Sequence, residues 1–243
     1  MIKKIRQSQL DKDYIKIYKY SVTPISVNLK NVVVTKPWGY EYLMFSNPET
    51  EIWNLSIKYQ RSTSMHCHPN KKTALVILSG RALFSTLNES WELMPHDAMV
   101  IDSGTFHSTQ SLSKEGLVLL EFETPPMKHD LLRLEDKYGR ARKGYEEETD
   151  RMMKERDYPR FLNVNKNSQI KNICNNRICV KEMKNHKDIA NLPQKNRTLA
   201  VVLSGVIKSE SDEPLYTTPH VLALEELQET GHNFNNVSLM LIR

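Results

Sequence analysis

Short apolar or alternating runs, each broken by turn residues, fill the chain between residues 31 and 123. Runs of about four to eight residues with this pattern are typical of β-strands, and strands at regular spacing are typical of a β-sandwich or β-barrel. Gly80 separates two of the runs, and glycine is favoured where a chain turns tightly, so a hairpin is predicted there. The runs are residues 31–35, 52–59, 73–79, 81–87, 98–102 and 116–122.

The same pattern returns after residue 161, and part of it repeats the first half of the chain. The sequence TLAVVLSG at residues 198–205 matches TALVILSG at residues 73–80 at an offset of 125 residues. Residues 126–160 are instead dense in charge and carry oppositely charged pairs four residues apart, which is typical of an exposed helix. We therefore predict an all-β chain with two barrels, although an unrelated β extension that completes one sheet would also fit the C-terminal pattern. The predicted units are a basic N-terminal arm (1–30), a first barrel (31–125), a helical connector (126–160) and a second barrel (161–243).

The net charge is +5, and residues 1–30 account for all of it with seven basic and two acidic side chains. No recognition motif or stacking aromatic array follows this arm, so we expect neither nucleic acid nor a membrane as a partner. No apolar run approaches the roughly 20 residues that cross a bilayer. Three cysteines are an odd number in a chain without a visible secretory signal, which favours reduced thiols and a cytoplasmic location.

Three histidines have a spacing that suits metal ligands. On an extended segment His66 and His68 point to one face and Cys67 to the other, because side chains alternate along a strand. Two imidazoles on one face can share a divalent metal. His107 follows a turn-bearing stretch, and hairpin-linked strands would bring it beside the first pair. We predict a divalent metal on His66, His68 and His107, whether zinc, iron, manganese, nickel or cobalt.

The segments HCHPNKKT at residues 66–73 and LMP at residues 93–95, together with Gly80, Gly104 and His107, resemble the paired motifs of the cupin superfamily. Within it, KPWGYE at residues 36–41 and RLEDKYGR at residues 133–140 are similar to the cupin domain of type II mannose-6-phosphate isomerases, including those fused to mannose-1-phosphate guanylyltransferases. The resemblance covers about residues 33–145. It implies double-stranded β-helix barrels, here a bicupin, that hold a metal on inward-facing His and Glu side chains.

One position departs from the family pattern. A carboxylate follows the second histidine by five positions in the family, whereas this chain has Thr73. A neutral hydroxyl is a poor metal ligand, so the expected site is three imidazoles plus water or substrate. If position 73 faces the histidines, Thr73→Glu should tighten metal binding.

Basic residues near the predicted barrel mouth are candidates for binding a sugar phosphate, because a cation with directional donors suits phosphate oxygens. Lys71, Arg61 and Arg81 are the predicted substrate-binding residues, and each would otherwise be a solvated charge. Arg140 matches an arginine that the resemblance implies near the substrate, and we predict a catalytic role for it; its alternative role is packing.

These residues favour a metal-dependent sugar-phosphate or nucleotide-sugar isomerase or epimerase, similar to mannose-6-phosphate isomerase, in the synthesis of surface polysaccharide. The metal would polarise a carbonyl oxygen, and Glu121 or Glu123 would move the proton as the general base. The expected ligand is a phosphorylated or nucleotide-linked sugar. Two alternatives stay open: a non-catalytic sugar-binding or regulatory cupin, and a three-histidine Fe(II) dioxygenase.

The second repeat lacks the metal-binding pattern. At the offset of 125 residues, Asn191 and Pro193 stand where the first repeat has His66 and His68, and only His232 aligns with a histidine. We therefore expect the C-terminal unit to bind no metal and to stabilise the chain, by covering a sheet edge or by building a homodimer.

Overall fold

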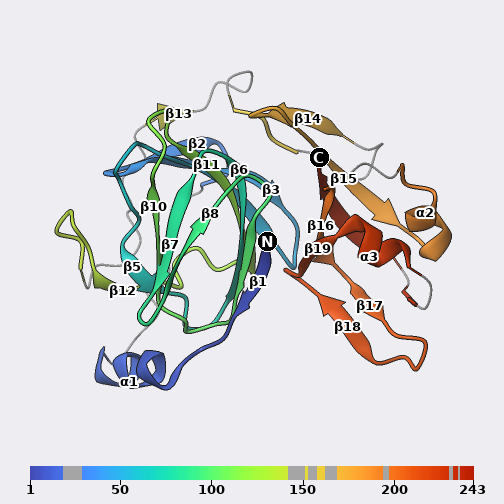
Figure 1. Ribbon diagram of the computed structural model, residues 1–243, viewed down its shortest axis with the longest axis horizontal. Helices are drawn as coiled ribbons and strands as arrows, with labels where there is room; N and C mark the ends of the chain where they lie inside the picture. The colour runs from blue at the N-terminus through green and yellow to red at the C-terminus, as the bar shows by residue number, and fades with distance from the viewer. Residues whose placement is uncertain are drawn as a thin grey trace.

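Strands are the main secondary structure of the computed structural model, and they form two units that each carry one large sheet (Figure 1). The structure describes residues 1–18, 29–141, 151–152, 158–161, 169–193, 197–229, 232–234 and 236–243. The prediction of an all-β fold is confirmed.

The first unit consists of two sheets packed face to face as a barrel. The larger sheet has the strand order β1-β9-β6-β11-β4-β3-β2-β13, and the smaller has the order β12-β5-β10-β7-β8. The strands of the larger sheet are β1 (Ile2–Ile5), β2 (Val32–Lys36), β3 (Gly39–Ser46), β4 (Glu51–Ile57), β6 (Lys72–Ser79), β9 (Ala98–Ile101), β11 (Leu117–Thr124) and β13 (Arg151–Met152). Those of the smaller sheet are β5 (Met65–Cys67), β7 (Ala82–Thr86), β8 (Ser90–Leu93), β10 (His107–Ser111) and β12 (Leu132–Glu135).

Side-chain alternation divides the strands of the larger sheet into an inner and an outer face. On β6, Leu75 and Ile77 join the barrel core with Phe84 from the opposite sheet. Ala74 and Val76 belong to a separate apolar cluster on the outer face. Because both faces of β6 are buried, its sequence is a continuous apolar run rather than an alternating one.

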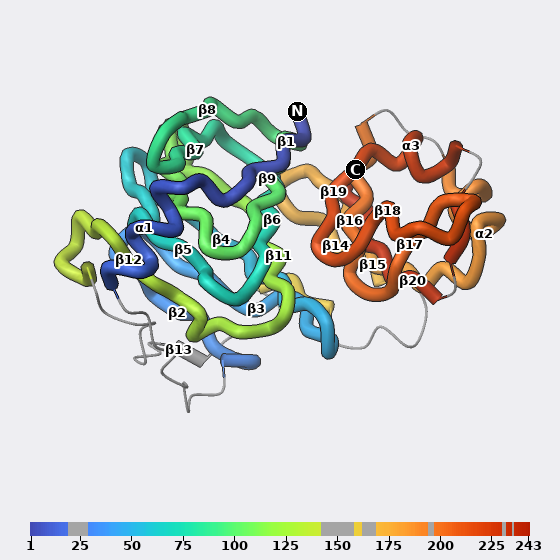
Figure 2. The backbone as a smooth tube through the Cα atoms, turned by 90° about the horizontal axis from the view of Figure 1, so that it is seen from below, coloured from blue at the N-terminus to red at the C-terminus, as the bar shows by residue number. Residues whose placement is uncertain are grey.

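The N-terminal residues are part of the first barrel. β1 pairs in parallel with β9 at the edge of the larger sheet, and α1 (Gln9–Tyr18) lies across one end of the barrel (Figure 2). The buried carboxylate of Asp11 accepts hydrogen bonds from the backbone N–H groups of Ser8 and Phe106. Tyr14 and Ile15 pack against Phe106. Residues 1–18 are therefore part of the barrel rather than of the separate basic arm predicted for residues 1–30, because charge density does not report strand pairing.

The described part of the segment expected to be a helical connector is not helical. Residues 132–135 form β12, which pairs with β5, and residues 151–152 form β13, which pairs with β2. Leu132, Arg133, Leu134 and Glu135 alternate as a strand does, and the charge pairs further along the segment obscured that signal. Residues 142–150 and 153–157, where most of the expected helix falls, lie outside the described residues.

The second unit repeats the central part of the larger sheet. Its sheet order, β14-β15-β20-β16-β19, corresponds strand for strand to β3-β4-β11-β6-β9, and a β17-β18 hairpin follows β16 as β7 and β8 follow β6. Gly80 and Gly205 occupy equivalent turns with φ angles of 84° and 80°, a left-handed backbone that favours glycine. The strands are β14 (Ile170–Ile173), β15 (Asn176–Met183), β16 (Leu199–Ser204), β17 (Val206–Lys208), β18 (Pro214–Thr217), β19 (Val221–Ala223) and β20 (Val237–Ile242). The repeat predicted from the sequence is therefore visible in the strand order.

Two short helices replace strands in this second unit. α2 (His186–Ala190) connects β15 to β16, where the first unit has β5, and α3 (Leu224–Gln228) connects β19 to β20, where the first unit has β10. α2 and α3 contact each other, as β5 and β10 do. The strands that carry the histidines of the first unit thus have helical counterparts, and Asn191 is the C-cap of α2.

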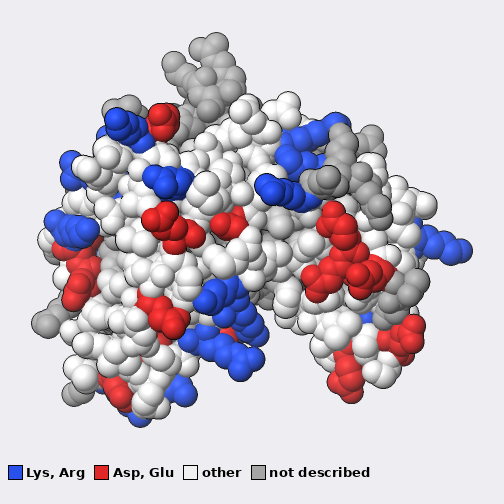
Figure 3. All heavy atoms as spheres, in the orientation of Figure 1, with Lys and Arg blue, Asp and Glu red and all other residues white. Residues whose placement is uncertain are grey.

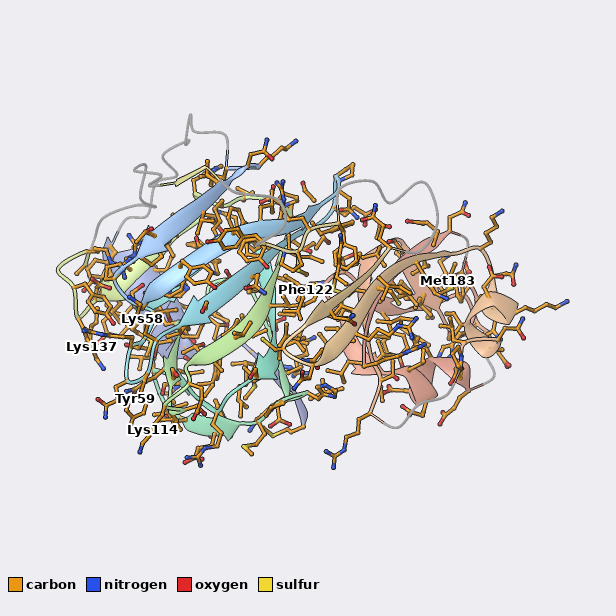
Figure 4. The ribbon with its side chains drawn as sticks, turned by 90° about the horizontal axis from the view of Figure 1, so that it is seen from above. Lys58, Tyr59, Lys114, Phe122, Lys137 and Met183 are labelled. Carbon is orange, nitrogen blue, oxygen red and sulfur yellow. The ribbon has the colours of Figure 1, made fainter. Side chains whose placement is uncertain are left out.

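The outer face of the larger sheet packs against the sheet of the second unit. Val76 and Phe122 of the first unit share one buried apolar cluster with Val201 and Met240 of the second. Figure 4 shows Phe122 on the side of the barrel that faces the second unit. The second unit therefore covers a sheet face, whereas the sequence suggested the cover of a sheet edge.

Hydrogen bonds across this contact are related by an approximate two-fold symmetry. Thr50 Oγ1 donates to the backbone oxygen of Leu203 at 2.9 Å. Asn176 Nδ2 donates to the backbone oxygen of Leu78, the equivalent of Leu203 at the offset of 125 residues, at 3.0 Å. The two units thus contact each other as two copies of one subunit would in a symmetric dimer.

The outside of the molecule carries charges of both signs. On the face drawn in Figure 3, basic and acidic side chains are interspersed over both units. No helix in the described part of the chain is long and apolar enough to cross a bilayer.

Candidate metal centre

Two strands of the smaller sheet bring the three predicted metal ligands together. His66 lies on β5 and His107 begins β10, and the two residues are directly opposite each other in the antiparallel pair. His68 follows β5 on the same face as His66, while Cys67 points the other way and packs with Phe106. All three cysteines are free thiols.

A carboxylate from the larger sheet completes the cluster. Glu121 on β11 points into the barrel, and its ligating atom and those of His66, His68 and His107 all lie within 4.8 Å of one another. All four side chains are buried. Three nitrogen ligands and one carboxylate oxygen are a suitable donor set for a divalent transition metal, so this cluster could hold one.

Backbone carbonyls fix which nitrogen of each imidazole faces the centre. The Nδ1 atoms of His66, His68 and His107 lie 2.8, 2.6 and 2.9 Å from the carbonyl oxygens of Ser64, Asp130 and Thr105 respectively. A carbonyl oxygen only accepts, so each Nδ1 carries the proton and each Nε2 keeps a lone pair. The Nε2 atoms of His68 and His107 are buried and have no hydrogen-bond partner among the described residues. A metal ion would satisfy these buried acceptors, and carbonyl-oriented imidazoles are typical of metal ligands.

The electrostatic state of the imidazoles suits the same role. Burial lowers the pKa of His66 and of His68 well below the usual value and lowers that of His107 to about 4. The three rings are therefore neutral at physiological pH, and only neutral imidazole binds a metal.

Glu121 changes the expectation drawn from Thr73. The sequence predicted three imidazoles without a carboxylate, because the family's carboxylate position holds threonine. Thr73 is buried on β6, and its direct neighbour in the sheet is Glu123 of β11. The carboxylate of the cluster comes instead from position 121, two residues further along the same strand. The sequence had named Glu121 as a general base rather than as a ligand.

Three of the four clustered side chains line an open cavity, in which about 450 Å³ of space is free of protein atoms when the adjoining solvent is included. Part of its wall is apolar, formed by Trp38, Leu55 and Leu131, and the rest is polar or charged. The other lining residues are Lys36, Glu41, Thr63, Ser64, His66, His68, Lys71, Glu121, Glu123, Lys128, Arg133 and Arg140. A concave, partly apolar site with a few convergent polar groups is typical of small-ligand binding.

A network of buried ion pairs joins the metal cluster to the cavity wall. Lys128 Nζ lies 3.0 Å from Glu123, 3.4 Å from Glu41 and 3.5 Å from Glu121. Lys71 pairs with Glu123 at 2.8 Å. A third lysine, Lys36, lies 3.5 Å from the Glu41 carboxylate, so three lysines balance three glutamates.

The two inward carboxylates of β11 differ in proton affinity. Burial, reinforced by the nearby Glu123 carboxylate, raises the pKa of Glu121 to about 7 in spite of Lys128. Burial also acts to raise the pKa of Glu123, but the positive charges of Lys128 and Lys71 outweigh it and hold that pKa at about 2. Glu123 is therefore ionised at neutral pH.

The predicted substrate-binding residues are not gathered in one place. Lys71 lines the cavity but is almost completely buried and engaged by Glu123. Arg140 lines the cavity, and its guanidinium is hydrogen-bonded to Asp136. Arg61 and Arg81 are exposed and do not line the cavity, so the structure does not bring them to the site. Lys58 and Tyr59, which precede Arg61, lie at the end of the barrel remote from the second unit (Figure 4).

Sequence reasoning missed several residues that line the cavity. Arg133 on β12 is buried, and its backbone lies opposite His66 in the sheet. In the sequence, Lys36 and Glu41 stood out only as the ends of the KPWGYE segment that resembles the isomerase family. No sequence pattern indicated that Lys128 belongs to the site. The alternation of residues 132–135 is the one pattern that could have placed Arg133 on a strand face.

The second unit has no comparable cluster among its described residues. Its interior contains aliphatic side chains such as Ile189, Val202, Leu222 and Leu239. His232, which aligns with His107, lies near His186 instead, with ring centroids 6.4 Å apart. Its Nδ1 lies 3.2 Å from the backbone oxygen of Glu229.

Comparison with known proteins gives distant likenesses. No protein-family model matches the chain. Among curated proteins the chain is similar to a mannose-1-phosphate guanylyltransferase from Klebsiella pneumoniae, with 24% identity over 110 residues, which covers 44% of this chain and 23% of that protein. The chain thus spans less than a quarter of the length of this curated relative.

Among solved structures, three bacterial proteins are similar to part of this chain. KdgF from a Halomonas species has a TM-score of 0.36 and 16% identity, covering 42% of this chain and 94% of that chain. An RmlC-like cupin from Shewanella frigidimarina has a TM-score of 0.36 and 12% identity, covering 42% and 91%. A sugar phosphate isomerase from a cupin superfamily of Silicibacter pomeroyi has a TM-score of 0.34 and 10% identity, covering 39% and 69%. These neighbours include cupins, and at such TM-scores they assign neither a family nor an activity to this chain.

Proposed function

We propose that this chain is a metal-dependent isomerase or epimerase that acts on a phosphorylated sugar. The observation that carries the proposal is the placement of three oriented imidazoles and one carboxylate against a cavity with two arginines in its lining. The metal, when bound by His66, His68, His107 and Glu121, would supply a Lewis acid that polarises a carbonyl oxygen of the sugar.

The two arginines in the cavity lining favour an anionic ligand. Arg133 and Arg140 both line the cavity, and Asp136 holds the Arg140 guanidinium in place at 2.7 Å. A guanidinium presents several donors in one plane and is well suited to phosphate oxygens. We assign phosphate binding to Arg133 and Arg140, because a guanidinium has donors left for a phosphate when one carboxylate already contacts it, whereas the single ammonium group of Lys71 is fully buried against Glu123.

An isomerase also needs a group that moves a proton next to the carbonyl. Glu121 would be occupied as a metal ligand, and Glu123 is a weak base because its pKa is about 2. Glu41 is the remaining carboxylate in the cavity lining and is proposed as the proton-transfer group. The apolar wall formed by Trp38 and Leu55 would limit the access of water to the reacting carbons.

The two alternative functions relate differently to the site. A three-histidine Fe(II) dioxygenase requires a metal site without a carboxylate, whereas the cluster here includes the Glu121 carboxylate. A non-catalytic sugar-binding protein would use the same cavity and arginines, and turnover separates it from an isomerase.

The test is exchange of the sugar C2 hydrogen with solvent. Metal-loaded protein would be incubated with aldose 6-phosphates in deuterated water, and deuterium at C2 would be followed by NMR. We expect exchange with the unmodified chain, loss of exchange in His66→Ala/His68→Ala, and a raised KM in Arg140→Ala. Arg81→Ala, which removes an exposed arginine outside the cavity, is the matched control. Saturable binding of the sugar phosphates without exchange would replace the enzyme by a sugar-binding protein.

A further inference from the structure

Glu121 lies between the imidazole cluster and Lys128, a largely buried lysine. One of its carboxylate oxygens is 3.9 Å from Nε2 of His68, and the other is 3.5 Å from Nζ of Lys128. The same carboxylate can therefore face a metal with one oxygen and an ammonium group with the other. The ammonium group would fix the orientation of the carboxylate relative to the imidazoles.

Lys128 is itself held from several sides. Its Nζ contacts Glu123 at 3.0 Å and Glu41 at 3.4 Å, and it lies 3.9 Å from the centre of the Trp53 ring. The side chain is only 10% exposed. An ammonium group held by two carboxylates and an aromatic face has a fixed position, so it can fix the position of a third carboxylate.

We propose that Lys128 is a positioning residue of the metal site, which holds the Glu121 carboxylate in the orientation that lets it act as a ligand. This inference rests on the metal site of the proposed function. It gives a role to a buried lysine outside the barrel strands, in the segment between β11 and β12. It also explains how Glu121 can be kept beside the carboxylates of Glu41 and Glu123 without being pushed away.

A purely electrostatic role would have the opposite consequence. A positive charge near a metal ion opposes its binding, so removing the charge of Lys128 would by itself tighten metal binding. If Lys128 acts instead by orienting Glu121, its removal weakens metal binding, because partners that orient a ligand typically contribute about 10- to 100-fold to metal affinity. The sign of the change therefore separates the two roles.

Lys71 provides a matched control in the same network. It is also buried and also contacts Glu123, at 2.8 Å, and its ion pair is with that residue rather than with Glu121. Lys71→Met thus removes one buried charge from the cluster without removing the ion pair to Glu121.

The experiment is a calorimetric titration of metal-free protein with Co²⁺, supported by the visible spectrum of the bound ion. We expect Lys128→Met to weaken Co²⁺ binding by about 10-fold or more and to alter the spectrum, and Lys71→Met not to weaken it. In a Glu121→Gln background, Lys128→Met should cause no further loss, because the residue through which it acts is already changed. Lys128→Arg keeps the charge and should restore most of the affinity, and it serves as the second variant if Lys128→Met fails to fold.

Three results would overturn the inference. These are tighter Co²⁺ binding in Lys128→Met, an equal loss in Lys128→Met and Lys71→Met, and a full additional loss in the Glu121→Gln background. If Glu121→Gln binds Co²⁺ as the unmodified chain does while His66→Ala/His68→Ala does not, the role of Lys128 fails and the histidine site stands. If the double histidine variant still binds Co²⁺, the proposed function itself fails.

Discussion

Each imidazole of the candidate centre is held by one backbone carbonyl, and these carbonyls come from three different segments. Ser64 precedes β5, Thr105 precedes β10, and Asp130 lies in the loop after β11. For His66 and His107 the carbonyl lies two residues before the histidine, whereas for His68 it lies 62 residues away, so only the orientation of His68 depends on a distant segment. The motif could be read from the sequence because the period of a strand is two, whereas the carbonyl partners could not.

Position 73 provides a prediction at this scale. Thr73 is 1% exposed and lies directly opposite Glu123, whose pKa is about 2. A glutamate at 73 would place two carboxylates in one cross-strand pair, which is destabilising, and a buried carboxylate without a partner costs several kcal/mol. We expect Thr73→Glu to lower the melting temperature of the metal-free protein and not to tighten metal binding, contrary to the expectation from sequence.

Thermal unfolding with and without Zn²⁺ would check this prediction. Thr73→Val is the matched control, since the Thr73 hydroxyl has no hydrogen-bond partner in the described part of the chain and its loss should cost little. A Thr73→Glu protein that melts as the unmodified chain does and binds Zn²⁺ more tightly would show that position 73 faces the metal.

At the scale of elements, α1 supports the loop that leads to His107. Asp11 of α1 accepts a hydrogen bond from the backbone N–H of Phe106 at 2.9 Å, next to the carbonyl of Thr105 that orients His107. The sequence did not reveal this link, because about 95 residues separate its two sides and the arm was judged from its charge. The order of the strands could not be read from the sequence either. The run of residues 116–122 indicated a strand, but not that β11 lies between β4 and β6, the position from which Glu121 points to the histidines.

Removing the Asp11 carboxylate should therefore affect both stability and the metal site. Asp11→Ala leaves the buried Phe106 N–H unpaired, which costs about 1–3 kcal/mol, and we expect lower stability together with weaker Zn²⁺ binding. Asp13→Ala is the matched control, because Asp13 is exposed on the same helix and bonds only to Gln9 among the described residues. Urea unfolding and calorimetry on both variants would check the prediction. Equal behaviour of the two variants would contradict a role for α1 in holding the His107 loop.

At the scale of the whole molecule, the second unit occupies the face that a second copy of the barrel would need for a symmetric dimer. The sequence showed the repeat through residues 198–205, and the strand order shows how far the repeat extends. The sequence also showed that the second repeat lacks the metal-binding histidines, because Asn191 and Pro193 stand at their positions. The sequence did not show that α2 and α3 replace two strands, because five-residue helices give too short a periodic signal. The homodimer expected from the sequence remains a prediction and would have to use other surfaces.

Removal of the second unit tests its contribution. A chain that ends at Phe161 would expose the outer face of the larger sheet, including Tyr42, Val76 and Phe122, each at most 3% exposed in the full chain. An apolar patch of this kind promotes association, so we expect the shortened chain to self-associate and to melt at a lower temperature than the full chain. Light scattering and thermal unfolding would check this. A monomeric shortened chain with unchanged heat stability would show that the second unit does not stabilise the first.

The central claim is that one buried site, formed by His66, His68, His107 and Glu121, holds a divalent metal. Calorimetric titration of metal-free protein with Zn²⁺ tests it most directly, with His66→Ala/His68→Ala as the variant. His186→Ala/His232→Ala, which removes the neighbouring pair of histidines in the second unit, is the control. We expect one Zn²⁺ per chain, loss of that binding in the first variant and unchanged binding in the second. Binding that survives in the first variant, or disappears in the second, would contradict it.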